Sequence, residues 1–162
     1  MIFVVVSTGH FDPLIETCDK LRDKYEFVGQ IGSGLYVPQF PHFRTGTPKE
    51  IETQMEKAEL VISHGGTGML SMLYQLKKKA VVIPKQVRYG EPNDSQVELS
   101  EKWAELGMAV LCMDVNDLAF SIEQCRVTEF QYVNFPKLGV QLNRDLNPIA
   151  PPASQVADSF SP

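Results

Sequence analysis

The sequence predicts an α/β protein with a Rossmann-like parallel sheet that carries helices on both faces. Short apolar runs alternate with stretches of helical periodicity along most of the chain. The first run, Met1–Val6, is continuous and rich in β-branched residues, which is typical of a central strand covered on both faces. Such alternation indicates parallel strands joined by right-handed crossovers.

Composition narrows the class of protein. The chain has 162 residues, of which 43% are hydrophobic, and its net charge is −5. This predicts one globular domain and argues against a nucleic-acid binder, which needs basic surface to neutralise phosphates. No apolar run is long enough to span a bilayer and no basic segment precedes one, so we expect a cytoplasmic protein without a signal peptide. The three cysteines are spaced too widely for a metal motif and are expected to be buried free thiols (Cys18, Cys112 and Cys125).

The first helix is expected after the loop Ser7–His10. Asp12 is expected to cap this helix, with Pro13 at its first position. Apolar residues then repeat at helical spacing along one face (Leu14, Cys18 and Leu21). A second strand, over Glu26–Ile31, is expected to end in the glycine loop Gly32–Gly34.

A second helix is predicted by a capping box. The irregular segment Tyr36–Arg44 contains two prolines and has room for one short strand. Thr47-Pro48-Lys49-Glu50 then forms the capping box, with proline at the first helical position. The helix that follows is expected to bury three apolar residues (Ile51, Met55 and Ala58).

The stretch Leu60–Gly68, with the sequence LVISHGGTG, is central to the functional prediction. Leu60–Ile62 is expected to be a buried strand that breaks into a turn at Ser63. The helix after the turn is expected to direct five apolar residues to the core (Met69, Leu70, Met72, Leu73 and Leu76). A strand, a glycine-rich turn and a helix point free backbone N–H groups at an anion, and glycine lets the backbone approach a ligand closely. This stretch therefore predicts a site for a nucleotide diphosphate.

The remaining chain continues the alternation. A strand over Ala80–Ile83 precedes the polar loop Lys85–Asp94, and a helix from about Ser95 to Leu106 is expected to turn Leu99, Trp103 and Leu106 inward. A strand over Met108–Cys112 and a helix over Asp114–Cys125 follow. We expect a nucleotide-sugar-binding domain over residues 1–140. A tail rich in proline and small polar residues, 141–162, is expected to be mobile or to dock a partner.

Ligands of parallel sheets bind at the carboxyl ends of the strands. Four loops should meet at that edge (Ser7–His10, Gly32–Gly34, Ser63–Gly68 and Lys85–Asp94). These loops are also the richest in Gly, Ser, Thr, His and Asn. Fold and composition thus predict one binding edge.

Several segments resemble glycosyltransferase family 28, whose members have the GT-B fold. Ile62–Gly68 is similar to the donor-binding motif of the family. Met1–Thr8 resembles its first strand and loop, Gln30–Ser33 its second loop, and Tyr89–Leu99 its segment ending in Asp-His-Gln-x-Glu-Leu. Together they span about residues 1–112 in order. The similarity is greatest to single-domain members, namely exopolysaccharide subunits of the PssE type and the catalytic subunit of the dolichol-pathway N-acetylglucosaminyltransferase.

The resemblance implies one half of a GT-B fold: the catalytic, donor-binding subunit of a two-component inverting transferase that moves a sugar from a UDP-sugar to a lipid-linked acceptor. The diphosphate would lie against the glycine turn and the first loop (Ser63, His64, Gly65, Gly66, Thr67, Gly68, Thr8 and Gly9). Two other loops would contact the base and the sugar or ribose (Gln30 and Gly32; Asn93, Asp94 and Gln96). A membrane-anchored partner would supply the acceptor half and hold the chain at the cytoplasmic face of the membrane.

Three departures from the family pattern leave the sugar open. Ser95 replaces the histidine of Asp-His-Gln, and Ser7 stands where glycine is usual. Many relatives have a ribose-binding glutamate in the helix after the glycine turn, where this chain has Met69–Met72. A non-catalytic subunit that binds a nucleotide sugar or regulates the complex is therefore the alternative function.

The chemistry of transfer needs a stabilised leaving group and a base for the acceptor hydroxyl. Helix N-terminal N–H groups can stabilise departing UDP, and no carboxylate pair has metal-site spacing, so we expect no cofactor and no essential metal. His10 and Glu91 are the candidate bases, with Asp94 as a further one. The alternatives are that His10 only shapes its loop and that the carboxylates of Glu91 and Asp94 are simply solvated at the surface.

Two other function classes fit less well. An oxidoreductase would need a G-x-G-x-x-G turn after the first strand, where this chain has Ser7-Thr8-Gly9-His10. A sugar epimerase of GT-B fold would need both domains in one chain. As a test of the phosphate site, Gly66→Val is expected to abolish donor binding and leave the fold mostly intact.

Overall fold

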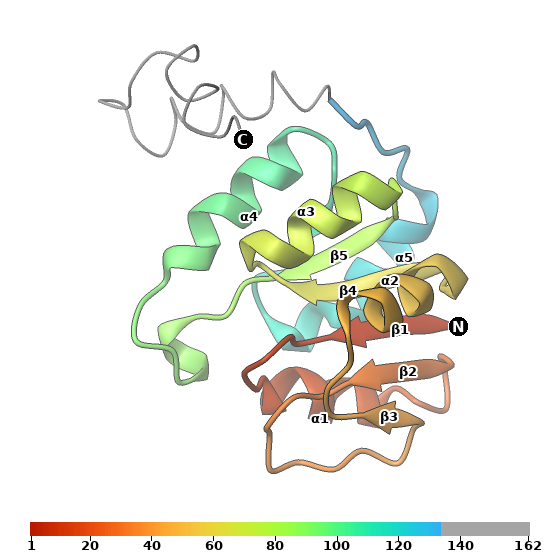
Figure 1. Ribbon diagram of the computed structural model, residues 1–162. Helices are drawn as coiled ribbons and strands as arrows, with labels where there is room; N and C mark the ends of the chain where they lie inside the picture. The colour runs from red at the N-terminus through yellow and green to blue at the C-terminus, as the bar shows by residue number, and fades with distance from the viewer. Residues whose placement is uncertain (134–162) are drawn as a thin grey trace, which may run out of the picture. The chain divides into compact units, whose positions relative to one another are not determined.

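The computed structural model describes residues 1–133, which form a six-stranded parallel sheet with helices on both faces (Figure 1). The strands are β1 (Ile2–Val5), β2 (Phe27–Gln30), β3 (His42–Phe43), β4 (Leu60–His64), β5 (Ala80–Ile83) and β6 (Val110–Leu111). Their order in the sheet is β3-β2-β1-β4-β5-β6. The chain thus builds outward from β1 in one direction and from β4 in the other, and ligands of such sheets bind at this switch point. The predicted fold class is confirmed.

Right-handed crossovers decide which face each helix covers. The helices are α1 (Asp12–Lys20), α2 (Pro48–Lys57), α3 (Thr67–Leu76), α4 (Ser95–Glu105) and α5 (Leu118–Val127), with short 3-10 turns η1 (Val87–Tyr89) and η2 (Val115–Asp117). Figure 1 shows α2, α3 and α4 on the near face of the sheet and α1 and α5 behind it. The reversal of direction between the two halves of the sheet accounts for this division.

Alternate strand residues serve the two layers, since side chains along a strand point to opposite faces. Ile2, Val4 and Ile62 belong to the core that includes Leu14 of α1 and Ile122 of α5. The intervening residues of β1, Phe3 and Val5, are equally buried, and they face the layer that contains α2 and α3. The central strands are therefore apolar on both faces, as the unbroken run at the N-terminus predicted.

Several local predictions are confirmed. Thr47 and Glu50 form the capping box at the start of α2, with both reciprocal hydrogen bonds present. The three cysteines are free and buried. Trp103 lies in the core, and β3 is the single short strand within the irregular segment after β2.

Other local predictions are wrong. Asp12 does not cap α1, because Phe11 precedes the helix without a side-chain cap; Asp12 Oδ2 instead accepts a hydrogen bond from Leu35 N at 3.0 Å and holds the loop after β2. β4 continues through Ser63 and His64 because both are paired with β5, so the turn begins at Gly65. The last helix begins at Leu118, after η2.

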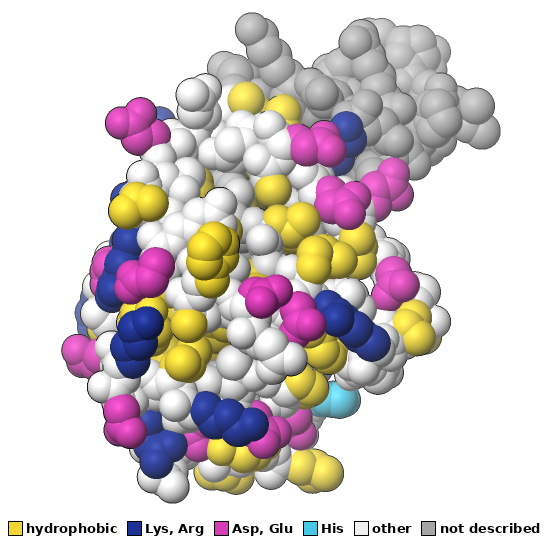
Figure 2. All heavy atoms as spheres, turned by 180° about the vertical axis from the view of Figure 1, so that it is seen from behind, with side chains coloured by type: hydrophobic (Ala, Val, Ile, Leu, Met, Phe, Trp, Pro, Cys, Tyr) yellow, Lys and Arg dark blue, Asp and Glu magenta, His cyan; other side chains and the backbone are white. Residues whose placement is uncertain are grey.

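The exterior of the described residues mixes both signs of charge. Figure 2 shows basic and acidic side chains interspersed over the face seen from behind. Within residues 1–133, no helix is long and apolar enough to cross a bilayer. The predicted tail, 141–162, lies outside the described residues.

Candidate functional site

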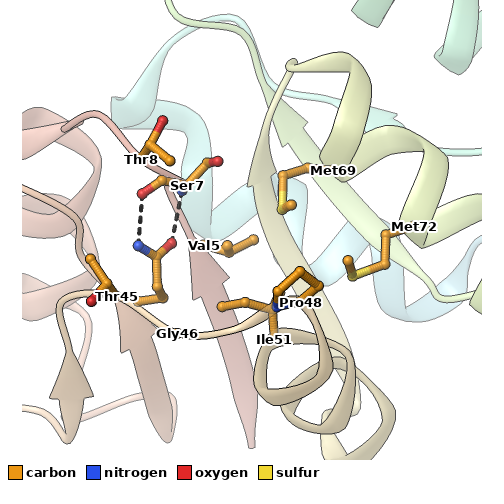
Figure 3. A pocket seen from close by; sticks show the side chains of 10 residues that line it. Val5, Ser7, Thr8, Thr45, Gly46, Pro48, Ile51, Met69 and Met72 are labelled. Carbon is orange, nitrogen blue, oxygen red and sulfur yellow. Dashed lines mark hydrogen bonds between the residues drawn. The ribbon is translucent and has the colours of Figure 1, made fainter.

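A pocket of about 290 Å³ lies at the carboxyl edge of the sheet. Figure 3 shows Ser7 and Thr8 on one side and Met69 and Met72 of α3 on the other. Met69 and Met72 are only half buried, which corrects the prediction that they belong to the core. The remaining walls of the pocket are largely apolar as well (Val5, Pro48 and Ile51, beside Thr45 and Gly46). The pocket thus offers an apolar surface between the first loop and the start of α3.

Gln30 shapes one wall of this pocket and is held entirely by backbone groups. Its Oε1 accepts hydrogen bonds from Val6 N at 3.2 Å and Ser7 N at 2.8 Å. Its Nε2 donates to Ser7 O and Arg44 O, both at 2.7 Å. Because these four bonds occupy the amide, Gln30 has only its carbon atoms left for the predicted contact with a base.

The loop after β2 packs directly on the loop after β1. Gly32 has φ 66, and a Cβ atom added there would lie 1.9 Å from Gly9 O. Ser33 N also donates to Gly9 O at 3.0 Å, and Arg44 Nη1 donates to Gly32 O at 3.0 Å. Gly32 is therefore required for the two loops to meet, whatever ligand they bind.

The three glycines of the turn after β4 differ in their surroundings. An added Cβ would lie 2.1 Å from Ser100 Oγ at Gly65 and 2.2 Å from the His64 ring at Gly66, but would meet nothing within 4 Å at Gly68. Internal packing thus explains the first two glycines, and Gly68 faces open space. The expectation that Gly66→Val leaves the fold intact is wrong, because the side chain would collide with a buried imidazole.

The amino end of α3 has free backbone donors. Gly66 caps it without a side-chain hydrogen bond, and its first turn contains no acidic residue. The first helical bond runs from Leu70 N to Gly66 O. Within residues 1–133, the N–H groups of Thr67, Gly68 and Met69 have no partner. Such an end attracts an anion through its N–H groups and the helix dipole.

His64 is buried beside this helix end as a neutral imidazole. Its Nδ1 lies 3.0 Å from Gly66 N, which donates to it, and 3.4 Å from Gln96 Oε1; the shorter contact favours the tautomer with the proton on Nε2. Nε2 is buried and has no hydrogen-bond partner among the described residues. Burial, assisted by the charge of Lys85 and opposed by Gln96, lowers the pKa of His64 to about 4. A buried donor of this kind needs an acceptor from water or a ligand.

The residues predicted from the fourth loop tie that loop together. Gln96 Oε1 accepts from Gly65 N at 3.0 Å and Lys85 N at 3.1 Å, which joins the glycine turn to the loop after β5. Asp94 Oδ1 accepts from Val87 N at 2.7 Å, and Asn93 Oδ1 accepts from Ser95 N at 3.0 Å. These side-chain oxygens already accept hydrogen bonds from backbone groups of the chain, although Asn93 and Asp94 are exposed.

Ser63 is fully buried, and its Oγ donates to His64 O at 2.9 Å. This structural role removes Ser63 from the residues that we expect to touch a donor. The two candidate bases differ in exposure: His10 is exposed on the first loop, whereas Glu91 is half buried in the loop after β5.

Lys85 is a site residue that sequence reasoning did not single out. It is only 7% exposed and lies two residues beyond the end of β5. A Cβ atom added to Gly9 would lie 3.0 Å from its Nζ, so the ammonium lies beside the first loop. The available signal was its position, since a lysine that follows a buried parallel strand lies at the ligand-binding edge.

Residues 1–133 contain no evident set of side chains that could ligate a metal ion. Among residues 1–133, no three His, Cys, Asp or Glu side chains are grouped so that they could hold a metal ion. That no metal is essential stays a prediction.

Comparison with known proteins gives the family. The sequence model of the glycosyltransferase family 28 C-terminal domain matches residues 1–134. The chain belongs to this family. A comparison with curated proteins gave no match.

Solved structures show the same fold as this family 28 chain. The NMR structure of ALG13 superposes with a TM-score of 0.59 at 17% identity, covering 87% of this chain and 94% of ALG13. MurG of Acinetobacter baumannii gives 0.56 at 15% identity, with 97% of this chain and 48% of MurG covered. The glycotransferase of kitacinnamycin gives 0.56 at 22% identity over 77% of this chain. The family 28 chain spans 34% of that last structure, about a third of its length.

Proposed function

We propose that this chain is the donor-binding half of an inverting glycosyltransferase and that its donor is a UDP-sugar. One observation supports this most directly: α3 begins with unpaired N–H groups beside an apolar pocket, in a family 28 domain. Met69 joins the two, because its N–H belongs to the helix end and its side chain lines the pocket. The diphosphate would bind the helix end and the nucleoside would fill the pocket.

In the proposed reaction the acceptor hydroxyl oxygen attacks C1 of the donor sugar from the face opposite to UDP. A new C1–O bond forms while the bond from C1 to the phosphate oxygen breaks, and its electron pair passes to the β-phosphate. The N–H groups of Thr67, Gly68 and Met69 would stabilise this growing charge. His10, exposed on the first loop, would take the proton of the acceptor.

We further propose that a second, membrane-anchored polypeptide supplies the acceptor-binding half and presents a lipid-linked sugar. Support comes from the fold similarity to ALG13, 94% of whose length this chain covers. An exposed site at the carboxyl edge leaves room for such a half to face it. The complex would work at the cytoplasmic face of the membrane, in exopolysaccharide or glycan synthesis.

The alternative is a subunit that binds the donor without turning it over. Ser95, in place of the family's histidine, favours it. The backbone N–H of Ser95 donates to Asn93 Oδ1 at the start of α4. This hydrogen bond gives the position a structural role that does not need an imidazole.

Calorimetry and turnover assays test the proposal in two steps. The purified chain is titrated with UDP, GDP and dTDP, and we expect UDP to bind most tightly. UDP release is then measured with a UDP-sugar, the membrane partner and its lipid acceptor. Absence of binding to all three nucleotides would refute the donor site, whereas binding without turnover would establish the alternative.

A further inference from the structure

Lys85 is the only buried lysine among residues 1–133. No described residue forms a hydrogen bond or an ion pair with its ammonium group. Burying a charged group without a partner is unfavourable, and burial accordingly lowers the pKa of Lys85. A side chain in this situation has its positive charge available for an anion that the chain itself does not provide.

The position of the ammonium is set by three loops. Lys85 N–H and Gly65 N–H share Gln96 Oε1 as acceptor, at 3.1 and 3.0 Å, so the lysine backbone is fixed against the glycine turn. Its Nζ reaches Gly9 in the loop after β1. Because β4 lies between β1 and β5 in the sheet, the side chain passes over the carboxyl end of β4. The charge therefore lies at the switch point, close enough to His64 to lower that residue's pKa.

A structural ion pair with Glu91 is the main competing explanation. The Glu91 carboxylate raises the pKa of Lys85 and so favours its charged form. However, the two form no ion pair in the described part of the chain. Glu91 therefore helps to keep the lysine protonated and leaves the ammonium hydrogens free for another acceptor.

We infer that Lys85 is the cationic contact for the diphosphate of the donor. The inference rests on the proposed function, because it requires a nucleoside diphosphate at this edge. In the transfer step the ammonium would face the β-phosphate oxygen that receives the electron pair of the broken C1–O bond. A charge fixed in a partly desolvated site interacts more strongly with that oxygen than a solvated one would. Lys85 would thus add a full charge to the partial charges of the α3 amides.

The test compares four proteins by calorimetry with the nucleotide that the wild type binds best among UDP, GDP and dTDP. Lys85→Met removes the charge and keeps the side-chain length, Lys85→Arg keeps the charge, and Lys57→Met makes the same charge change at the exposed far end of α2. We expect Lys85→Met to weaken binding by about 10- to 100-fold, in line with the loss of a charge-assisted contact. Lys85→Arg should bind within several-fold of the wild type, and Lys57→Met should match it.

Each result bears on a different claim. Equal binding by Lys85→Met and the wild type would overturn the inference and leave the proposed donor site standing. Failure of the wild type to bind any of the three nucleotides would overturn the proposed function and this inference together. Thermal unfolding without ligand separates misfolding from lost contact, since Lys85→Met should unfold at or above the wild-type temperature. If that variant does not fold, Lys85→Gln provides the same comparison.

Discussion

Gln30 holds Ser7 in a left-handed backbone conformation by binding both of its backbone polar groups. Ser7 has φ 64, and the amide of Gln30 accepts from its N–H at 2.8 Å and donates to its carbonyl at 2.7 Å. Residues other than glycine adopt this conformation at a cost of about 1–2 kcal/mol. A buried side chain on β2 thus fixes the loop that begins the candidate site.

Replacing Gln30 should loosen this loop. Gln30→Leu leaves the Ser7 N–H, the Ser7 carbonyl and the Arg44 carbonyl without this partner. We expect unfolding in urea to show a loss of about 3 kcal/mol, since each buried polar group left unpaired costs about 1–3 kcal/mol. Gln75→Leu, at an exposed position of α3, is the control. A loss of unfolding free energy below about 1 kcal/mol would contradict the role of Gln30 in holding Ser7.

Ser7→Gly makes the opposite change. Glycine adopts a positive φ without strain, so this variant should gain up to about 1 kcal/mol of unfolding free energy, offset in part by the greater freedom of glycine in the unfolded chain. The same urea experiment measures it. A clear loss of stability would mean that the serine side chain makes a contribution larger than the backbone strain.

Gly68 and Gly66 should respond differently to a side chain. Gly68→Leu places its side chain in the open space beside the first turn of α3, so we expect normal thermal unfolding but UDP binding weakened beyond about 10-fold, or 1.4 kcal/mol. Gly66→Ala should lower the unfolding temperature, because its Cβ would lie 2.2 Å from the His64 ring. Wild-type UDP affinity in Gly68→Leu would argue against placing the phosphates at α3.

Stability should fall at mildly acidic pH because of His64. Its pKa is about 4 in the folded chain against 6.5 normally, so the unfolded chain takes up the proton first as the pH falls. The contribution of neutral His64 to the free energy of unfolding is fully present above pH 6.5. It is lost progressively towards pH 4, by up to about 3 kcal/mol. His64→Asn, which keeps an acceptor near Gly66 N, should show a shallower pH dependence in urea unfolding. Identical profiles would exclude His64 as the cause.

Chelation should leave donor binding intact. The α3 amides provide positive potential without a metal, so UDP affinity measured in EDTA should match that measured in magnesium. A loss of affinity by more than about 10-fold, or 1.4 kcal/mol, in EDTA would indicate a required cation.

His10→Ala tests the proposed base. We expect turnover with partner and acceptor to fall by about 10²- to 10⁴-fold while UDP affinity is unchanged, since general bases contribute rate rather than donor binding. Glu91→Gln is the companion variant. A larger loss of turnover in Glu91→Gln than in His10→Ala would transfer the role to Glu91.

The prediction from sequence was most successful where pattern alone decides structure. The unbroken apolar run at the N-terminus and the Thr47–Glu50 capping box both gave correct elements because their signals are local. The site was harder, because its key relations join residues far apart in sequence. Gln30 with Ser7, Gln96 with Gly65, and Lys85 with Gly9 are contacts between loops that only the sheet order brings together. The glycines illustrate the same limit: Gly65 and Gly66 are required by neighbours from α4 and β4, whether or not a ligand binds there.

Both edge strands of the sheet are very short, since β3 and β6 contain two residues each. So short a ladder offers few free backbone groups for another chain to extend by strand addition. A companion protein that packed on residues 1–133 would therefore contact helices and loops rather than extend the sheet. If the proposed partner binds this chain, mutations that disrupt the complex should map to helices and loops and spare the outermost strands.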